Sequence, residues 1–255
     1  MGDDGGAGTR AVGGSRMSGG VEGTRVSDAA QRRTARVAGI AYLLALPPAV
    51  FAEFLVLGRL VAGDDAAATA RKIVAHERLF RLGIASNLAV FALDVVLIVA
   101  LYLTLKPVSR PVALVALGWR MIETALLATA ALHDLDALQM LSGTSYLRVL
   151  ASEQLQAMAR LALASHGATY NVALVFAGLG SAAFCWLWLV SGWVPRALAG
   201  LGLFASILMA VCTAAFIVAA GLHEVIPVAV YGGPIFLFEL TMGCWLALRG
   251  LRASA

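Results

Sequence analysis

Six long apolar runs constrain this chain more than any other feature of its sequence. Each is longer than the roughly 18 residues that identify a membrane-spanning helix, and can cross a ~30 Å hydrocarbon core. The composition agrees, because 60% of the 255 residues are hydrophobic and only 13% are charged. We therefore predict an all-α integral membrane protein with six transmembrane helices, at about residues 37–58, 82–105, 111–133, 168–190, 197–220 and 227–248.

Two connections between the spans are predicted to form amphipathic helices. Residues 64–81 begin with Asp64 and Asp65, which are suited to cap a helix N-terminus. In this segment and in residues 146–164, apolar side chains recur at helical spacing among charged ones, as in helices that lie on a membrane surface. These apolar positions are Ile73, Val74, Leu79 and Phe80, and then Leu147, Leu150, Leu155, Met158 and Leu161.

The chain is divided into a tail and a membrane domain by its composition. Residues 1–35 are rich in Gly, Ser and Arg and have almost no large apolar side chains, so we predict that they are disordered. Residues 36–252 are predicted to form the six-helix domain. Within it, Pro47 and Pro48 are expected to kink the first span, and Pro234 to bend the sixth.

The basic residues predict the orientation of the domain. Of the 19 Lys and Arg residues, 11 fall on the side of the N-terminus and 7 on the other side, with Arg120 in neither set. Because positive charge is retained in the cytoplasm, both termini are predicted to be cytoplasmic. Both amphipathic helices are then extracytoplasmic.

Four segments of the chain, taken in order, resemble a known family. They read "ATARKIVAHERLFRLGIASNL", "ALYLTLKPVSRPVALVALGWRMIETALL", "SGWVPRALAGLGLFASI" and "FELTMGCWLALRGLR". In this order and with six spans, they resemble the bacterial membrane family catalogued as domain of unknown function 4386, over roughly residues 35–252. The resemblance implies a compact six-helix protein of a bacterial plasma membrane, and it implies no assigned activity and no catalytic residues.

Ionisable residues inside the spans are the candidate functional residues. By helical rise, Asp94 and Glu239 lie about 20 and 18 Å from the outer edge and Arg120 about 14 Å from the inner edge, so all three share a mid-membrane layer. Glu123 lies one turn from Arg120 on the same face. Glu53 lies nearer the outer end of the first span. We expect Arg120, Glu123, Glu53, Trp119 and His133 to contribute to a binding site.

Several carboxylates share a single guanidinium in this set. A charged side chain at the bilayer centre costs about 2.5–3.5 kcal/mol or more, and a carboxylate without a cation in low dielectric keeps its proton. Asp94 and Glu239 are therefore candidate catalytic acids. The alternative is that Arg120 only fastens helices together by pairing with Asp94, Glu123 or Glu239.

The remaining motifs are weaker. Cys185, Cys212 and Cys244 are isolated in apolar runs, so we predict no metal site and no cofactor. The sequence "HDLD", with His133, could hold a divalent ion only with His166 or His223. The glycines of "GLGSAAF" and "AGLGLF" are interpreted as helix-packing contacts. No basic stripe with interleaved aromatic residues predicts nucleic-acid binding.

Three classes of function fit these features. The first is a membrane protein that binds or moves a lipophilic or protonatable small molecule through a cavity centred on Arg120. The second is a membrane-embedded, acid-catalysed isoprenoid or terpenoid cyclase or isomerase, in which Trp119 and Trp186 shield a carbocation. The third is a structural accessory protein without catalysis. The sequence leaves the oligomeric state open.

Overall fold

The computed structural model describes residues 18–63, 65–143, 147, 149–219 and 221–252. The chain is 88% helical, no strand occurs in this described part, and six helices are long and apolar enough to cross a membrane. The predicted fold class is thus confirmed. The elements are α1 (Ser18–Val50), η1 (Phe51–Leu57), α2 (Gly58–Leu60), α3 (Ala66–Ala75), α4 (Glu77–Leu105), α5 (Arg110–Leu141), α6 (Ser152–Ser191), α7 (Arg196–Val218), α8 (Leu222–Val225) and α9 (Val228–Leu248).

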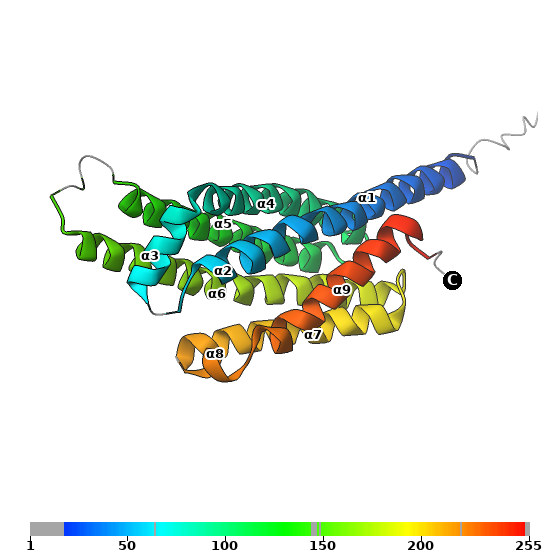
Figure 1. Cartoon of the computed structure of the whole chain (residues 1–255). Coiled ribbons are helices and arrows are strands. Elements are labelled where there is room, and N and C mark those ends of the chain that lie inside the picture. The colour runs from blue at the N-terminus through cyan, green and yellow to red at the C-terminus, as the bar shows by residue number, and fades with distance from the viewer. Residues whose placement is uncertain (1–17, 64, 144–146, 148, 220, 253–255) are drawn as a thin grey trace, which may run out of the picture.

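The six long helices close into a ring in which each helix packs against two neighbours. Around the ring the order is α1, α4, α5, α6, α7 and α9, and α9 returns to pack against α1. Helices α1 and α9 lie together near the chain termini and diverge toward the end of the bundle that carries α3 and α8 (Figure 1). We call this end the α3 end.

The first span changes its helical hydrogen bonding part-way along. Pro47 and Pro48 lie inside α1, and the π-helix η1 starts three residues later, with the amide of Gly58 donating to the carbonyl of Glu53. Proline lacks an N–H and its ring crowds the preceding turn, so regular α-helical bonding is weakened there. The π-helix buries Ala52 and Val56 against the neighbouring helices and thereby sets the direction of Glu53.

The two predicted amphipathic segments have different outcomes. The first contains α3, where the Asp65 side chain accepts a hydrogen bond from the Ala68 amide at 2.8 Å, and where Ile73 is fully buried. Asp64 lies outside the described residues. The second segment is not a separate helix, because α6 starts at Ser152 and continues through it into the fourth span.

The apolar face of that second segment also differs from the prediction. Leu161 is 68% exposed and Met158 is exposed as well, whereas Ala159, Ala162 and Leu163 are buried. Two of these three buried side chains are alanines, which suit the close packing of α6 against α5. A single glycine, Gly167, does not interrupt a helix that is held by such packing.

Residues just before the predicted start of the membrane domain already pack against the bundle. Gln31 donates to the carbonyl of Thr104 at 2.8 Å, the Thr34 and Thr104 hydroxyls are 3.0 Å apart, and Ala35 is fully buried. These residues belong to α1 and contact α4. Residues 1–17 lie outside the described residues, so the predicted tail stays a prediction there.

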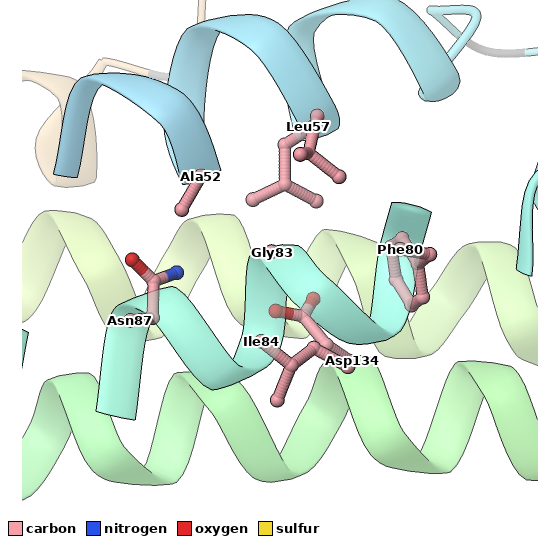
Figure 2. A pocket seen from close by; sticks show the side chains of 8 residues that line it. Ala52, Leu57, Phe80, Gly83, Ile84, Asn87 and Asp134 are labelled. Atoms are coloured by element: carbon pink, nitrogen blue, oxygen red, sulfur yellow. The ribbon is translucent and has the colours of Figure 1, made fainter. Parts of the chain in front are cut away.

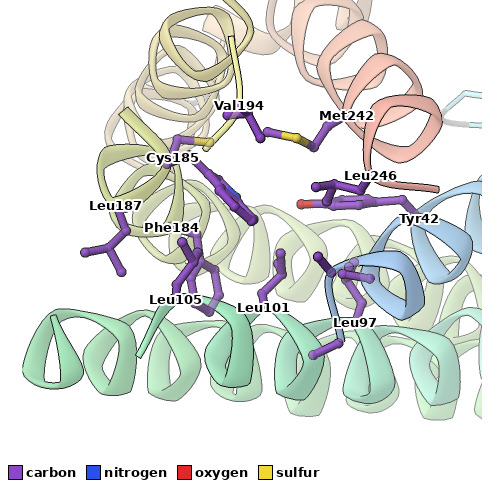
Figure 3. Close-up of a cluster of buried hydrophobic side chains, with 14 of the residues drawn as sticks. Tyr42, Leu97, Leu101, Leu105, Phe184, Cys185, Leu187, Val194, Met242 and Leu246 are labelled. Atoms are coloured by element: carbon purple, nitrogen blue, oxygen red, sulfur yellow. The ribbon is translucent and has the colours of Figure 1, made fainter. Parts of the chain in front are cut away.

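Two apolar clusters fill the ring, one at each end. Near the termini, α1, α4, α6 and α9 contribute Tyr42, Leu101, Phe184 and Met242, among others (Figure 3). At the α3 end, the second cluster includes Val56, Phe80, Leu138 and Leu163. The twelve described polar side chains that are buried include Asn87, Asp94, Arg120, Glu123, Thr124 and Ser181 on α4, α5 and α6.

Close backbone contacts join the helices, and most of the glycines in the two predicted packing motifs take part. A Cβ atom on Gly178 would lie 2.6 Å from the carbonyl oxygen of Ser206 and 2.6 Å from the Ala210 Cβ. One on Gly180 would lie 2.7 Å from Arg120 Cγ, and one on Gly202 would overlap the Phe238 ring. Gly200 has open space instead, so the interpretation is confirmed for three of these four glycines.

We expect Gly178→Ala to destabilise the α6–α7 contact, because a backbone oxygen cannot move aside cheaply. Overpacking of this kind costs about 1–3 kcal/mol. Gly200→Ala is the matched control, since its methyl group meets no atom within 4 Å. The measurement is the free energy of unfolding in detergent. Equal stability of the two variants would contradict this packing.

Candidate functional site

The bundle contains two polar clusters at different depths. The arginine cluster consists of Asp94 on α4, Arg120 and Glu123 on α5, and Ser181 on α6. The histidine cluster lies nearer the α3 end and consists of Glu53, Asn87, Asp134 and His166, from η1, α4, α5 and α6.

Arg120 is the centre of the first cluster. Its Nη1 lies 2.8 Å from Glu123 Oε2 and donates to Oε1 at 3.0 Å, while its Nη2 lies 3.9 Å from Asp94 Oδ1. Arg120 and Glu123 are only 6% and 4% exposed. The three-residue spacing makes Glu123 the closest partner, as predicted from the helical repeat.

Neighbouring groups hold Arg120 in place. Gly180 on α6 leaves room for the side-chain stem, and the Ser181 hydroxyl accepts from Nη1 at a long 3.5 Å. The Thr124 hydroxyl donates to the Arg120 carbonyl at 3.0 Å. The guanidinium therefore sits in a closely packed, charge-paired setting that joins α4, α5 and α6.

Glu239 approaches this cluster less closely than predicted. It is half-buried on α9 and interacts electrostatically with Arg120 and Asp94. Among the described residues, however, it forms no ion pair of 4.0 Å or less. Glu239 is therefore a carboxyl group near the arginine cluster without a direct partner in it.

The histidine cluster begins with Glu53 of the π-helix. Asn87 Nδ2 donates to Glu53 Oε1 at 3.1 Å. This contact is permitted by Gly83 on α4, because a Cβ there would lie 2.8 Å from Val56 Cγ1 of η1. Asn87 points from α4 toward the π-helix in Figure 2, beside a small depression with no room for a water molecule.

Asp134 and His166 form the second half of this cluster. His166 Nδ1 lies 3.1 Å from Asp134 Oδ1 and 3.2 Å from the carbonyl oxygen of Ala130. The Asp134 contact is an ion-pair contact, since Oδ1 accepts no hydrogen bond from the described residues. An ionised carboxylate and a carbonyl both accept, so Nδ1 carries a hydrogen and Nε2 remains for other interactions. Asp134 is only 1% exposed.

A cavity of about 430 Å³ opens beside the histidine cluster. It lies between η1, α6, α7 and the α8–α9 segment, where α1 and α9 diverge. Its polar lining includes Glu53, His166, Tyr170, Asn171 and Tyr231, and the rest is mainly apolar. Small-molecule sites are commonly apolar cavities of roughly 300–1,000 Å³ with a few convergent polar groups.

The remaining predicted site residues lie elsewhere. Trp119 is half-buried, and no described aromatic or cation–π pair involves it. Trp186 is 52% exposed on the outer face of α6. His133 lies 4.0 Å from Asp136, while its neighbour Asp134 turns to His166, so the "HDLD" residues do not converge. No three His, Cys, Asp or Glu side chains of the described part gather as metal ligands.

A periodicity in the sequence could have identified the histidine cluster. Asn87 and Asp94 are seven residues apart on α4, and Arg120 and Asp134 are fourteen apart on α5. Both spacings place the pairs on one helix face, directed into the bundle. The prediction rested on depth in the membrane and not on which polar residues share a helix face. For this reason, Asp134 was not paired with His166.

Comparison with known proteins gives a family but no activity. No curated protein matches the chain, and neither does any solved structure. The family described as a domain of unknown function (DUF4386) matches residues 37–250, which include both clusters and the cavity lining. The chain therefore belongs to this DUF4386 family, as the resemblance of its polar and apolar segments predicted.

Proposed function

We propose that this protein binds a lipophilic small molecule within its membrane domain, in the cavity beside the histidine cluster. The observation that carries the proposal is a 430 Å³ space in which a carboxyl group, two imidazoles and two phenols face one largely apolar chamber. Burying several polar groups in a membrane domain costs free energy, which a ligand with a complementary head and an apolar body offsets.

This proposal moves the binding site away from Arg120. The sequence analysis placed the cavity at the arginine cluster, but Arg120, Asp94 and Glu123 do not line the 430 Å³ cavity. Their short contacts and the close approach of Gly180 support a fastening role for Arg120 instead. Glu53 lines the cavity and is retained as a binding residue.

The enzyme alternative is also best placed at Glu53. An isoprenoid cyclase or isomerase needs an acid that reaches its substrate, and Glu53 faces the cavity whereas Asp94 and Glu239 do not line it. The rings of Tyr170, Phe216 and Tyr231 also line the chamber. Glu53→Gln would abolish product formation in that case while leaving the fold intact.

Filling the cavity tests the binding proposal. A Cβ on Gly167, which lines the cavity, would meet no atom within 4 Å, so Gly167→Leu should fit the fold and occupy the ligand space. We expect wild-type protein in nanodiscs to be labelled saturably at cavity residues by a dodecanol carrying a photoreactive diazirine. Gly167→Leu should lose this labelling, and Gly200→Leu, outside the cavity, should retain it. Equal labelling of both variants would contradict the proposal.

Substitutions in the arginine cluster test the fastening role. Arg120→Ala leaves carboxyl groups that can take up protons, whereas Arg120→Glu adds a further acid and should lower the melting temperature more. Asp94→Asn should cost about 1–3 kcal/mol through its weakened charge interaction. Glu239→Gln should cost less, because none of the described residues forms an ion pair with Glu239.

The melting temperature in detergent and the cavity labelling are measured together for these variants. A fastening role predicts that labelling falls only where stability falls. Lost labelling in a fully stable Asp94→Asn or Glu239→Gln would instead assign ligand handling to the arginine cluster.

We propose further that the protein resides in a bacterial plasma membrane with both termini in the cytoplasm. The asymmetry of basic residues supports this orientation. In a Cys244→Ser background, a membrane-impermeant thiol reagent applied to intact cells should label Ser152→Cys and miss Pro107→Cys; both positions are exposed. Labelling of Pro107→Cys alone would reverse the orientation.

A further inference from the structure

We infer that the ligand of the cavity is a lipophilic ammonium ion, whose cationic head pairs with Glu53 and whose apolar chain extends among the helices. This inference rests on the proposed binding function and adds the chemical class of the ligand. Three observations support it: the charges around the cavity, the carboxyl oxygen of Glu53 that accepts no hydrogen bond from the described residues, and the aromatic rings in the lining.

The charges that face the cavity favour a cation. None of the described lining residues is Lys or Arg, and Glu53 is the acid among them. His166 and His223 also face it, but His166 lies 3.1 Å from the buried Asp134, which compensates a charge on the imidazole. Asp134 can balance a charge on His166, so Glu53 is the carboxyl group of this cluster without a cationic side chain as its direct partner.

One carboxyl oxygen of Glu53 is available to accept a hydrogen bond from a ligand. Asn87 occupies Oε1 at 3.1 Å, which fixes the orientation of the carboxyl group. Oε2 has no hydrogen-bond partner among the described residues, and the side chain lines the cavity. A primary ammonium group supplies up to three donors to such an acceptor, and charge-assisted bonds of this type are shorter and stronger than neutral ones.

Aromatic rings complete the environment that a cationic head prefers. Phe216 and Tyr231 meet edge to face with ring centroids 5.3 Å apart, and both line the cavity. Tyr170 stacks on His166 at 5.9 Å and lines the same space. The faces of aromatic rings attract cations, and several rings around one pocket are a recurrent way of binding ammonium groups.

Other head groups fit the cavity less well. A fatty acid would place its carboxylate beside Glu53, with no Lys or Arg in the described lining to offset the repulsion. An alcohol can hydrogen-bond to Glu53 but supplies no charge to balance it. A carrier of anionic lipids would therefore need a different lining.

Probes that share one chain and differ only in the head group test the inference. Wild-type protein in phosphatidylcholine nanodiscs is labelled with the diazirine dodecanol, and dodecylamine, dodecanol and dodecanoate compete for the cavity adduct. We expect dodecylamine to compete at a concentration about 30-fold or more below that of dodecanol, as for a buried charge pair. Glu53→Gln should remove this advantage, so that dodecylamine competes no better than dodecanol.

Two controls separate the role of Glu53 from general effects on the fold or on membrane charge. Asp136→Asn removes an exposed carboxylate at the same end of the bundle that does not line the cavity, and it should keep the preference for the amine. Tyr231→Phe should keep the preference, because the ring remains, whereas Tyr231→Leu should reduce it. The melting temperature of each variant identifies any loss of fold.

The outcomes distinguish this inference from the binding proposal. Equal competition by amine and alcohol, or better competition by dodecanoate, overturns the ammonium class while the binding proposal stands. Absence of saturable cavity labelling by any probe overturns both. If phosphatidylethanolamine added to the nanodiscs competes like dodecylamine, the ammonium belongs to a lipid head group; if it does not, the ammonium belongs to a free amine. Either result supports the class.

Discussion

The ion pair between Arg120 and Glu123 is the interaction on which the rest of the membrane domain depends. An unpaired guanidinium inside a bilayer is costly, so α5 can cross the membrane only with its charge compensated. Glu123 supplies the compensating negative charge from the same helix at 2.8 Å. The charge of Arg120 can therefore be balanced within α5 before this helix packs against others. Asp94 then draws α4 toward Arg120, and Gly180 lets α6 approach the side-chain stem. A charge that must be buried in this way fixes the relative rotation of three helices.

The π-helix of the first span determines where the domain opens. Close contacts at the opposite end hold α1 to α9, since a Cβ on Gly39 would lie 2.5 Å from the Ala247 amide nitrogen. Toward the α3 end the two helices separate, whereas η1 stays packed against α4, where Gly83 meets Val56. Glu53 is thereby directed to Asn87 on one side and to the cavity on the other. A chamber forms because the first span keeps its contact with α4 but separates from α9 part-way along.

The features that depend on segment length and local residue spacing could be predicted from the sequence. The six spans follow from apolar runs, and the Arg120–Glu123 pair follows from a three-residue repeat on one helix. Depth alone brought Asp94 to the same layer, but it could not separate Asp94 from Glu239, because depth leaves the rotation of each helix undetermined. The pairing of Asp134 with His166 joins two long helices, so it depends on their packing and not on any local motif.

The direction of Glu53 was the hardest feature to predict. The α-helical repeat assigns a face to each residue, and a π-helix adds a residue to the turn and breaks that assignment. The prolines in front of it pointed to an irregularity, but not to its type or its effect on the following side chains. The second amphipathic segment differed for another reason, because packing of α6 buried Ala159 and Ala162 and left Met158 and Leu161 exposed.

The two clusters contain similar residue types but have different roles, because their charges are balanced differently. Arg120 is surrounded by acids within its own protein, so it has no need of an external partner and the space around it is filled. Glu53 has an amide as its direct partner, and an amide orients a carboxylate without neutralising it. His166, which also lines the cavity, is held by Asp134. Balance at Glu53 must therefore come from a proton or from a cation that enters the cavity, and the aromatic lining favours a cation with an organic head. A carboxyl group that is oriented but not neutralised, at the mouth of an apolar chamber, is the physical basis for selecting amphiphiles by charge.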